Sequence, residues 1–240
     1  MSLEKAAKAG FAKAREIYTG KDASKTPISG LPERYKSNNK LHLSVGSTRQ
    51  SDSFIDWNPG DADQEARYVD RLGKADIEFG KGRVSLTGGV LQAGETLRKS
   101  CAQALNCQEL ACIAAECAYT ELGKPNPAPI ALADLEKPAD HKFCVVADSS
   151  SLTKLKGVPI DQLGSIFSMS DDAWVADPWL NVCCRLCNYG VLAEAQLKKW
   201  QSKNKRIAWN SGSLGAGWYA PQGEYSKGFM QAKLVLTAAS

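Results

Sequence analysis

The sequence predicts an α+β fold, because helix-like segments fill the first half of the chain and strand-like segments fill the second. Residues 107–122 carry small and apolar side chains at helical spacing, and the prolines of GKPNPAP end that helix. The 240 residues are 43% apolar and 23% charged, which is ordinary for a soluble domain with a sizeable core. The later segments that we predict as strands are 142–147, 173–177, 205–209 and 228–237.

The chain begins with a predicted helix over residues 2–18, which Ser2 can cap and whose apolar residues recur at helical spacing. Residues 19–39 are polar and rich in glycine, proline and serine, which is typical of a linker. We therefore expect an N-terminal helix and flexible linker over residues 1–40, followed by the main domain over residues 41–240.

Four further elements follow from the same reasoning. Residues 41–45 alternate as in a strand, and residues 61–72 form a helix whose acidic start suits the positive end of its dipole. Residues 77–94 are strand-like with a break at two glycines, and residues 191–202 are helix-like.

Net charge and cysteine content narrow the class of protein. The charge of +4 is small and evenly spread, so no nucleic-acid partner is predicted. No apolar run reaches the roughly 18 residues that span a bilayer, and the charged, amphipathic N-terminus differs from a Sec-type signal peptide. Without such a signal we expect the eight cysteines to be reduced, although their even number leaves four disulfides as an alternative.

Three residues have the chemistry of a thiol nucleophile and its partners. Cys107 occupies the first turn of a predicted helix, where unpaired backbone N–H groups stabilise a thiolate. His141 shares one face of a predicted strand with Phe143, and Asp177 ends another strand just before a proline. A nucleophile, a base and an orienting group on separate elements are what thiol acyl transfer requires.

The backbone N–H groups around Cys107 can also hold an oxyanion, and Gln103, four residues upstream, is a candidate side-chain donor. Structural alternatives remain open: Cys107 as an inert core cysteine, His141 as a structural histidine and Asp177 as a turn aspartate. Asn181 is a substitute for the third member, Asp140 is a weaker candidate, and we expect His42 to face solvent.

The segments NCQELACIAAECAY, DHKFCVV and DAWVADPWLNV resemble the papain-fold domains of secreted bacterial toxins and effectors. In that family a Gly/Asn-Cys-x-Glu helix start, an Asp-His-x-Phe strand and an Asp-Pro-Trp strand end supply the triad. The resemblance covers residues 100–185 and implies Cys107 as nucleophile, His141 as base and Asp177 as orienter. It also implies a papain-like domain over residues 41–240, in which the helix bearing the cysteine packs on an antiparallel sheet bearing the histidine and aspartate.

The same resemblance implies a cysteine-dependent hydrolase that deamidates glutamine in a target-cell protein, with a cysteine protease as the alternative. Such a protein is secreted without a Sec signal, acts in the cytosol of the target cell and has a secretion chaperone or immunity protein as a possible partner. No cofactor is implied. Trp179 and Gln108 are the expected substrate-binding residues, and Gln108 stands where many members of the family carry glycine.

Three other readings remain. The cysteines 183, 184 and 187 could form half of a zinc site, but no second C-x-x-C exists, so we predict no metal. A peptidoglycan amidase would use a similar Cys–His pair. The aromatic segment 209–225 could instead belong to a non-catalytic binding module, or form core and a glycine-rich hairpin. Cys107→Ala separates an enzyme from a binding module, because only the enzyme loses its effect.

Overall fold

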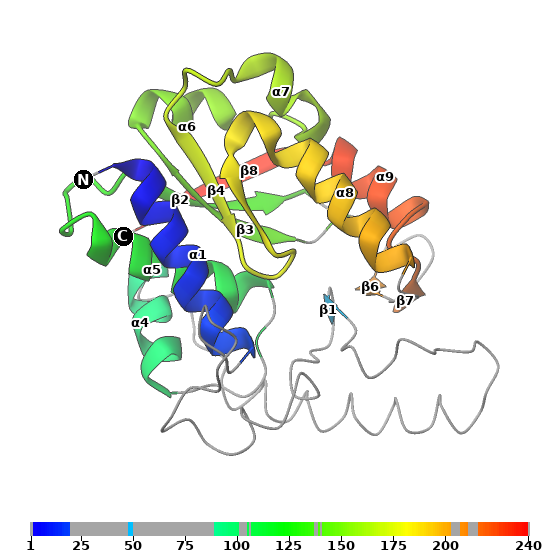
Figure 1. Cartoon of the computed structure of the whole chain (residues 1–240), viewed down its shortest axis with the longest axis horizontal. Coiled ribbons are helices and arrows are strands. Elements are labelled where there is room, and N and C mark those ends of the chain that lie inside the picture. The colour runs from blue at the N-terminus through cyan, green and yellow to red at the C-terminus, as the bar shows by residue number, and fades with distance from the viewer. Residues whose placement is uncertain are drawn as a thin grey trace.

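The chain folds as helices packed on a five-stranded antiparallel sheet, so the predicted α+β class is confirmed (Figure 1). The computed structural model describes residues 2–19, 48–49, 89–100, 105, 107–136, 139, 141–202, 207–210 and 216–239. The helices are α1 (Leu3–Thr19), α4 (Val90–Ser100), α5 (Cys107–Glu121), α6 (Ser149–Leu155), α7 (Leu163–Ile166), α8 (Tyr189–Ser202) and α9 (Glu224–Gln231). The strands are β1 (Thr48–Arg49), β2 (Ile130–Leu135), β3 (Lys142–Ala147), β4 (Ala173–Asp177), β5 (Val182–Arg185), β6 (Ile207–Asn210), β7 (Ala216–Tyr219) and β8 (Leu234–Ala238).

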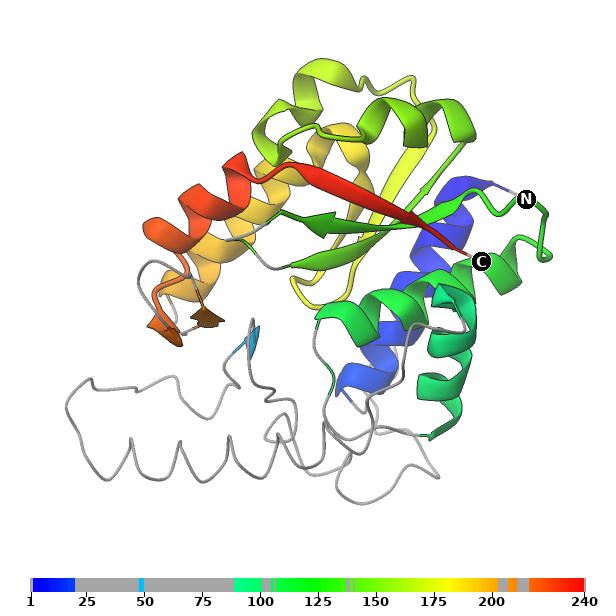
Figure 2. The same ribbon diagram turned by 180° about the vertical axis from the view of Figure 1, so that it is seen from behind.

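The main sheet has the strand order β5-β4-β3-β2-β8, and each neighbouring pair is antiparallel. Strand β8 forms one edge, which is seen best from behind (Figure 2). A second, three-stranded antiparallel sheet joins β1, β6 and β7. Register in the main sheet pairs Val145 of β3 with Val175 of β4, so alternate residues of the two strands share a face.

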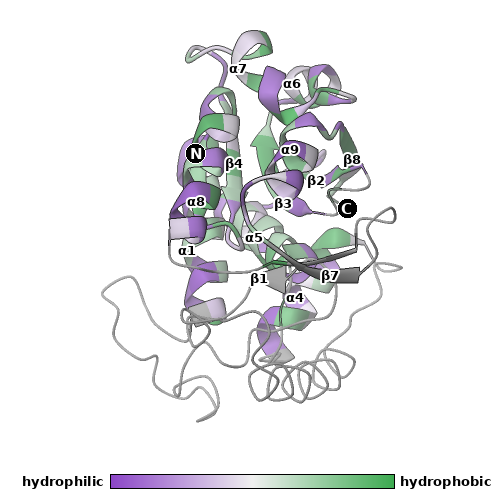
Figure 3. Ribbon diagram, turned by 90° about the vertical axis from the view of Figure 1, so that its right-hand side faces the viewer, coloured by the Kyte–Doolittle hydropathy of each residue, from purple (hydrophilic) through white to green (hydrophobic). Residues whose placement is uncertain are grey.

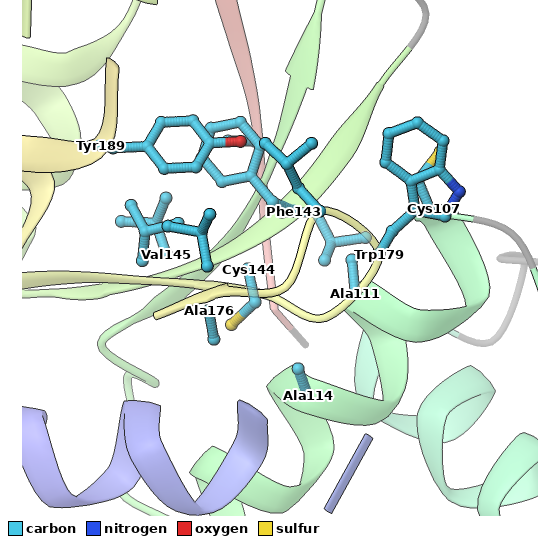
Figure 4. Close-up of a cluster of buried hydrophobic side chains, with 14 of the residues drawn as sticks. Cys107, Ala111, Ala114, Phe143, Cys144, Val145, Ala176, Trp179 and Tyr189 are labelled. Carbon is cyan, nitrogen blue, oxygen red and sulfur yellow. The ribbon is translucent and has the colours of Figure 1, made fainter. Parts of the chain in front are cut away.

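The two faces of the main sheet carry different layers. Phe143 and Val145 lie on the face covered by α8, where the Phe143 and Tyr189 rings are 4.5 Å apart (Figure 4). Cys144 points to the opposite face, toward Ala114 of α5 (Figure 4). Hydrophobic residues gather on the strands, and hydrophilic residues gather on the outer sides of the helices (Figure 3). In the part of the chain that is described, no helix combines the length and apolar character needed to cross a bilayer.

Small residues bring α1 and α4 into contact with the backbone of α5. A Cβ atom added at Gly10 of α1 would lie 2.2 Å from the carbonyl oxygen of Ala114, and one at Gly94 of α4 would lie 2.2 Å from that of Cys112. An ion pair of 2.9 Å between Arg98 Nε and Glu116 Oε2 also joins α4 to α5. Helix α5 is therefore held by two helices and the sheet, which fixes the position of its first residue.

Several predicted elements are confirmed. Helices predicted over residues 2–18, 107–122 and 191–202 correspond to α1, α5 and α8. The strands predicted over 142–147 and 173–177 have the same bounds as β3 and β4, and the strand predicted over 205–209 overlaps β6.

Two strand predictions are wrong in part. Residues 77–94 were expected to be strand-like, but α4 begins at Val90, because Val90, Ala93 and Leu97 form a buried stripe at helical spacing. Residues 228–231 belong to α9, whose Tyr225 and Phe229 are buried one turn apart, and the strand β8 begins only at Leu234. The strands β2 and β5 were not predicted from the sequence.

Helix α1 shares the core of the domain, since its Ala6, Ala7 and Ala14 are fully buried. Most of the predicted linker, and the elements predicted over 41–45 and 61–72, lie outside the described residues. The division into residues 1–40 and 41–240 therefore stays a prediction.

Candidate active site

The antiparallel register of β3 and β4 brings His141 and Asp177 together. Cys144 pairs with Ala176, so Asp177 lies beside Phe143 and shares a face with His141, its diagonal neighbour across the two strands. His141 Nε2 and Asp177 Oδ2 are 2.7 Å apart, and both side chains are 0% exposed. Two residues separated by 36 positions in the sequence thus form one buried pair.

The Asp177 carboxylate receives two further hydrogen bonds. The Tyr189 hydroxyl donates to Oδ2 at 2.8 Å, and the backbone N–H of Leu180 donates to Oδ1 at 2.9 Å. Asn181, the residue after Leu180, adopts a left-handed conformation with φ of 61°, which asparagine tolerates, and β5 begins at the next residue. Arg15 of α1 donates to the carbonyl oxygen of Pro178 at 3.0 Å, which ties the same turn to the N-terminal helix.

Aromatic rings surround the imidazole of His141. The ring centroids of Trp179, Phe229 and Phe143 lie 4.9, 5.5 and 6.0 Å from that of the histidine.

This burial lowers the pKa of His141, but the charge and hydrogen bond of Asp177 raise it. Interaction with Cys107 raises the pKa further, so that it moves from its usual 6.5 to about 10. The imidazole is therefore the charged imidazolium at neutral pH.

The second ring nitrogen of His141 is not bonded to Asp177. Its Nδ1 is buried and makes no hydrogen bond of regular geometry among the described residues, although Cys107 is close enough to raise the pKa of the ring. Cys107 is the first residue of α5 and is 5% exposed. Figure 4 shows it at the same end of the sheet as Trp179. Asp177, His141 and Cys107 thus form a chain of side chains in that order.

The remaining thiols have a different environment. Burial raises the pKa of Cys112, Cys117 and Cys184 to about 12 and that of Cys183 to about 11. Burial also raises the pKa of Cys144. These five side chains are therefore neutral thiols at neutral pH.

The seven cysteines that the structure describes all have free thiols. Among all the residues that the structure describes, no group of three or more histidine, cysteine, aspartate or glutamate side chains could hold a metal ion. Cys183 and Cys184 are consecutive residues of β5, so they point to opposite faces of the sheet.

The two expected substrate-binding residues differ in exposure. Trp179 is 1% exposed, covers the His141 ring and packs edge-on against Trp200 with centroids 5.1 Å apart. Its buried Nε1 has no hydrogen-bond partner in the described structure. Gln108, the second residue of α5, is partly exposed. Substrate binding by these two residues stays a prediction.

Several other candidates lie outside the described residues or outside the triad. The structure does not describe Gln103, Asp140 or His42, nor residues 211–215 of the aromatic segment. Asn181 is described, but it belongs to the turn after Asp177, and His141 Nε2 hydrogen bonds to the Asp177 carboxylate.

Sequence reasoning missed two residues that contact the His141–Asp177 pair, Tyr189 and Phe229. Tyr189 lies 12 residues after Asp177 and begins α8, and Phe229 lies on the far helix α9. No local pattern marks either residue as part of a site. Only the packing of α8 and α9 over the sheet brings their rings to His141 and Asp177.

Comparisons of the chain with models of known protein families, with characterised proteins and with solved structures found no match.

Proposed function

We propose that the protein is a cysteine-dependent hydrolase in which Cys107 is the nucleophile, His141 the base and Asp177 the group that orients the base. One observation carries the proposal: Asp177 holds Nε2 of His141, while Nδ1 has no hydrogen-bond partner among the described residues and the ring interacts with Cys107. An antiparallel sheet with the histidine and aspartate, packed on the helix that begins at the cysteine, supports a papain-like arrangement.

The chemistry follows from the charge on the imidazole. An imidazolium beside a thiol favours the thiolate, which is the reactive form of cysteine. The thiolate sulfur attacks the carbonyl carbon of a carboxamide, and the C=O π electrons move to the oxygen. Unpaired N–H groups in the first turn of α5 stabilise the resulting oxyanion.

The oxyanion then collapses, the C–N bond breaks, and the imidazolium of His141 gives its proton to the leaving nitrogen. The thioester on Cys107 remains. A water molecule, deprotonated by the neutral imidazole, attacks this thioester and releases a carboxylic acid and the thiolate. The aspartate keeps the ring in one orientation throughout.

We propose the side-chain carboxamide of glutamine in a target-cell protein as the substrate, so that ammonia leaves and glutamate remains. The resemblance of the three motifs to secreted bacterial toxins and effectors supports this choice. The same resemblance supports secretion of the protein and a chaperone or immunity protein as its partner. The same triad cleaves a peptide bond in a protease. The two outcomes differ in product, because deamidation releases ammonia and proteolysis creates new chain ends.

Reactivity of the thiols tests the nucleophile. The native protein is treated with limiting iodoacetamide from about pH 5 to about pH 9, and the modified cysteines are located by peptide mass spectrometry. Exposure alone would favour Cys117, Cys183 and Cys187, which are partly exposed, over Cys107, which is 5% exposed. We expect Cys107 to react first, and to do so well below the pH of about 8.5 at which free thiols ionise.

If labelling instead follows exposure, the proposed nucleophile is wrong. If Cys107 is activated, the substrate is sought by incubating the native protein and its Cys107→Ser variant with lysates of candidate target cells. Deamidation predicts conversion of glutamine to glutamate at a few positions with ammonia release. New chain termini without that conversion would replace the deamidase with a protease.

A further inference from the structure

Tyr189 is the one described side chain besides His141 that hydrogen bonds to the Asp177 carboxylate. Its hydroxyl donates to Oδ2 at 2.8 Å, the same oxygen that accepts the hydrogen bond from His141 at 2.7 Å. Figure 4 shows the Tyr189 hydroxyl pointing past Phe143 toward the end of the sheet where Cys107 and Trp179 lie. The tyrosine is 0% exposed, so water does not compete for this contact.

The direction of this hydrogen bond is fixed by the electrostatics around Tyr189. Burial raises the pKa of Tyr189 well above its usual 10, and the Asp177 charge raises it further. The hydroxyl therefore keeps its proton at every pH at which the protein would be assayed. A protonated phenol beside a carboxylate oxygen that lacks a proton is the donor.

We propose that Tyr189 is a positioning residue of the thiol site, which acts on Cys107 by holding the Asp177 carboxylate in the rotamer that aims Nδ1 of His141 at the thiol. This inference rests on the proposed function. The tyrosine does not touch the substrate. Its effect passes through Asp177 and then through the imidazole.

The geometry explains why the carboxylate needs this second contact. The Leu180 N–H holds Oδ1 at 2.9 Å, but it is part of the turn that follows Asp177 and moves with it. Tyr189 begins α8, so it holds Oδ2 from a separate element, 12 residues further along the chain. With both oxygens held, rotation of the buried carboxylate would break a hydrogen bond to a charged acceptor. The imidazole, bonded to the same Oδ2, then has one orientation.

Tyr189→Phe tests the inference, because it removes the hydroxyl and keeps the ring that packs against Phe143. We expect the rate of Cys107 alkylation at neutral pH to fall about 10-fold, the effect of one hydrogen bond to a charged group. We also expect the far-downfield proton resonance of the His141 Nε2–H to shift. Tyr119→Phe, which removes a partly exposed hydroxyl on α5, is the matched control and should change neither quantity.

A double-mutant cycle with Asp177→Asn shows whether Tyr189 acts through the aspartate. We expect Tyr189→Phe to have no further effect on alkylation once Asp177 is replaced. Additive effects, an unchanged alkylation rate or an unmoved Nε2–H resonance in Tyr189→Phe would each overturn the inference. The proposed function fails separately: it fails if Cys107 is not activated in the unsubstituted protein, whatever Tyr189→Phe does.

Discussion

Two regions of the molecule hold buried cysteines, and they differ in what faces the sulfur. At the start of α5, Cys107 is 5% exposed and faces the imidazole of His141. Between α5 and β3, Cys112 is 1% and Cys144 0% exposed. Burial is the largest cause of the raised pKa of both Cys112 and Cys144. The next largest is the electrostatic interaction with a nearby ionisable side chain, Glu109 for Cys112 and Cys183 for Cys144.

The comparison teaches that burial alone does not decide what a thiol can do. A buried thiol surrounded by apolar and acidic groups stays protonated and behaves as a small hydrophobic side chain. A buried thiol beside an imidazolium has a counter-ion for its thiolate. The difference lies in one partner, His141, whose own charge depends on Asp177.

The largest effect should come from removing that partner. His141→Gln replaces the imidazolium with a neutral side chain, so we expect Cys107 alkylation at neutral pH to fall about 10³-fold, within the range of general acid–base effects. Labelling of Cys144 in the same sample is the internal control and should stay low. Equal Cys107 labelling in the variant and the unsubstituted protein would mean that the two regions do not differ in the way described.

The next effect concerns the helical layer rather than the site. Gly94→Ala places a Cβ 2.2 Å from the Cys112 carbonyl oxygen, so α4 or α5 must shift. We expect the free energy of unfolding to fall by about 3 kcal/mol, the upper range for overpacking. Urea denaturation measures this change. Gln92→Ala, at an exposed position of the same helix, should stay within about 0.5 kcal/mol, and an equal loss in both variants would contradict the close packing.

A third effect is the pH dependence of stability. His141 has a folded-state pKa of about 10 against 6.5 in the unfolded chain, so the folded protein binds the extra proton between these values. Its stabilisation is fully present below pH 6.5 and is lost as the pH rises through about 10. The slope is at most ~1.4 kcal/mol per pH unit.

Urea denaturation from pH 6.5 to about pH 8 measures this slope. Above this range the buried thiols, whose pKa values are also raised, would add a decline of their own. In Asp177→Asn the charge that raises the pKa of His141 is gone and burial, which lowers it, remains, so the decline over this range should disappear. A decline of the same size in the variant would show that another group is responsible.

The smallest effect should follow Cys144→Ala. Loss of one buried sulfur between β3 and α5 should cost about 1 kcal/mol of unfolding free energy. Cys107 alkylation and its pH dependence should be unchanged, because Cys144 points to the opposite face of the sheet from His141. A change in Cys107 reactivity would show that the two regions are coupled.

Sequence patterns were sufficient where the structure is decided by nearby residues. The helix that starts at Cys107 and the strands β3 and β4 follow from apolar spacing and from the prolines that end the elements. The same patterns placed His141 and Asp177 at the ends of their strands. They failed at α4 and α9, where short apolar runs fit either a helix or a strand and packing on the core decided between them.

The sequence by itself determined which residues could carry the chemistry: a cysteine at a helix start, a histidine at a strand start and an aspartate at a strand end. Only the tertiary structure decided that these residues meet, because the register of β3 against β4 is a long-range pairing that no local pattern specifies. It also decided the charge on His141, which depends on burial and on the nearby Asp177. The tertiary structure also decided that Tyr189 is part of the site, since only the packing of α8 over the sheet brings its hydroxyl to the Asp177 carboxylate.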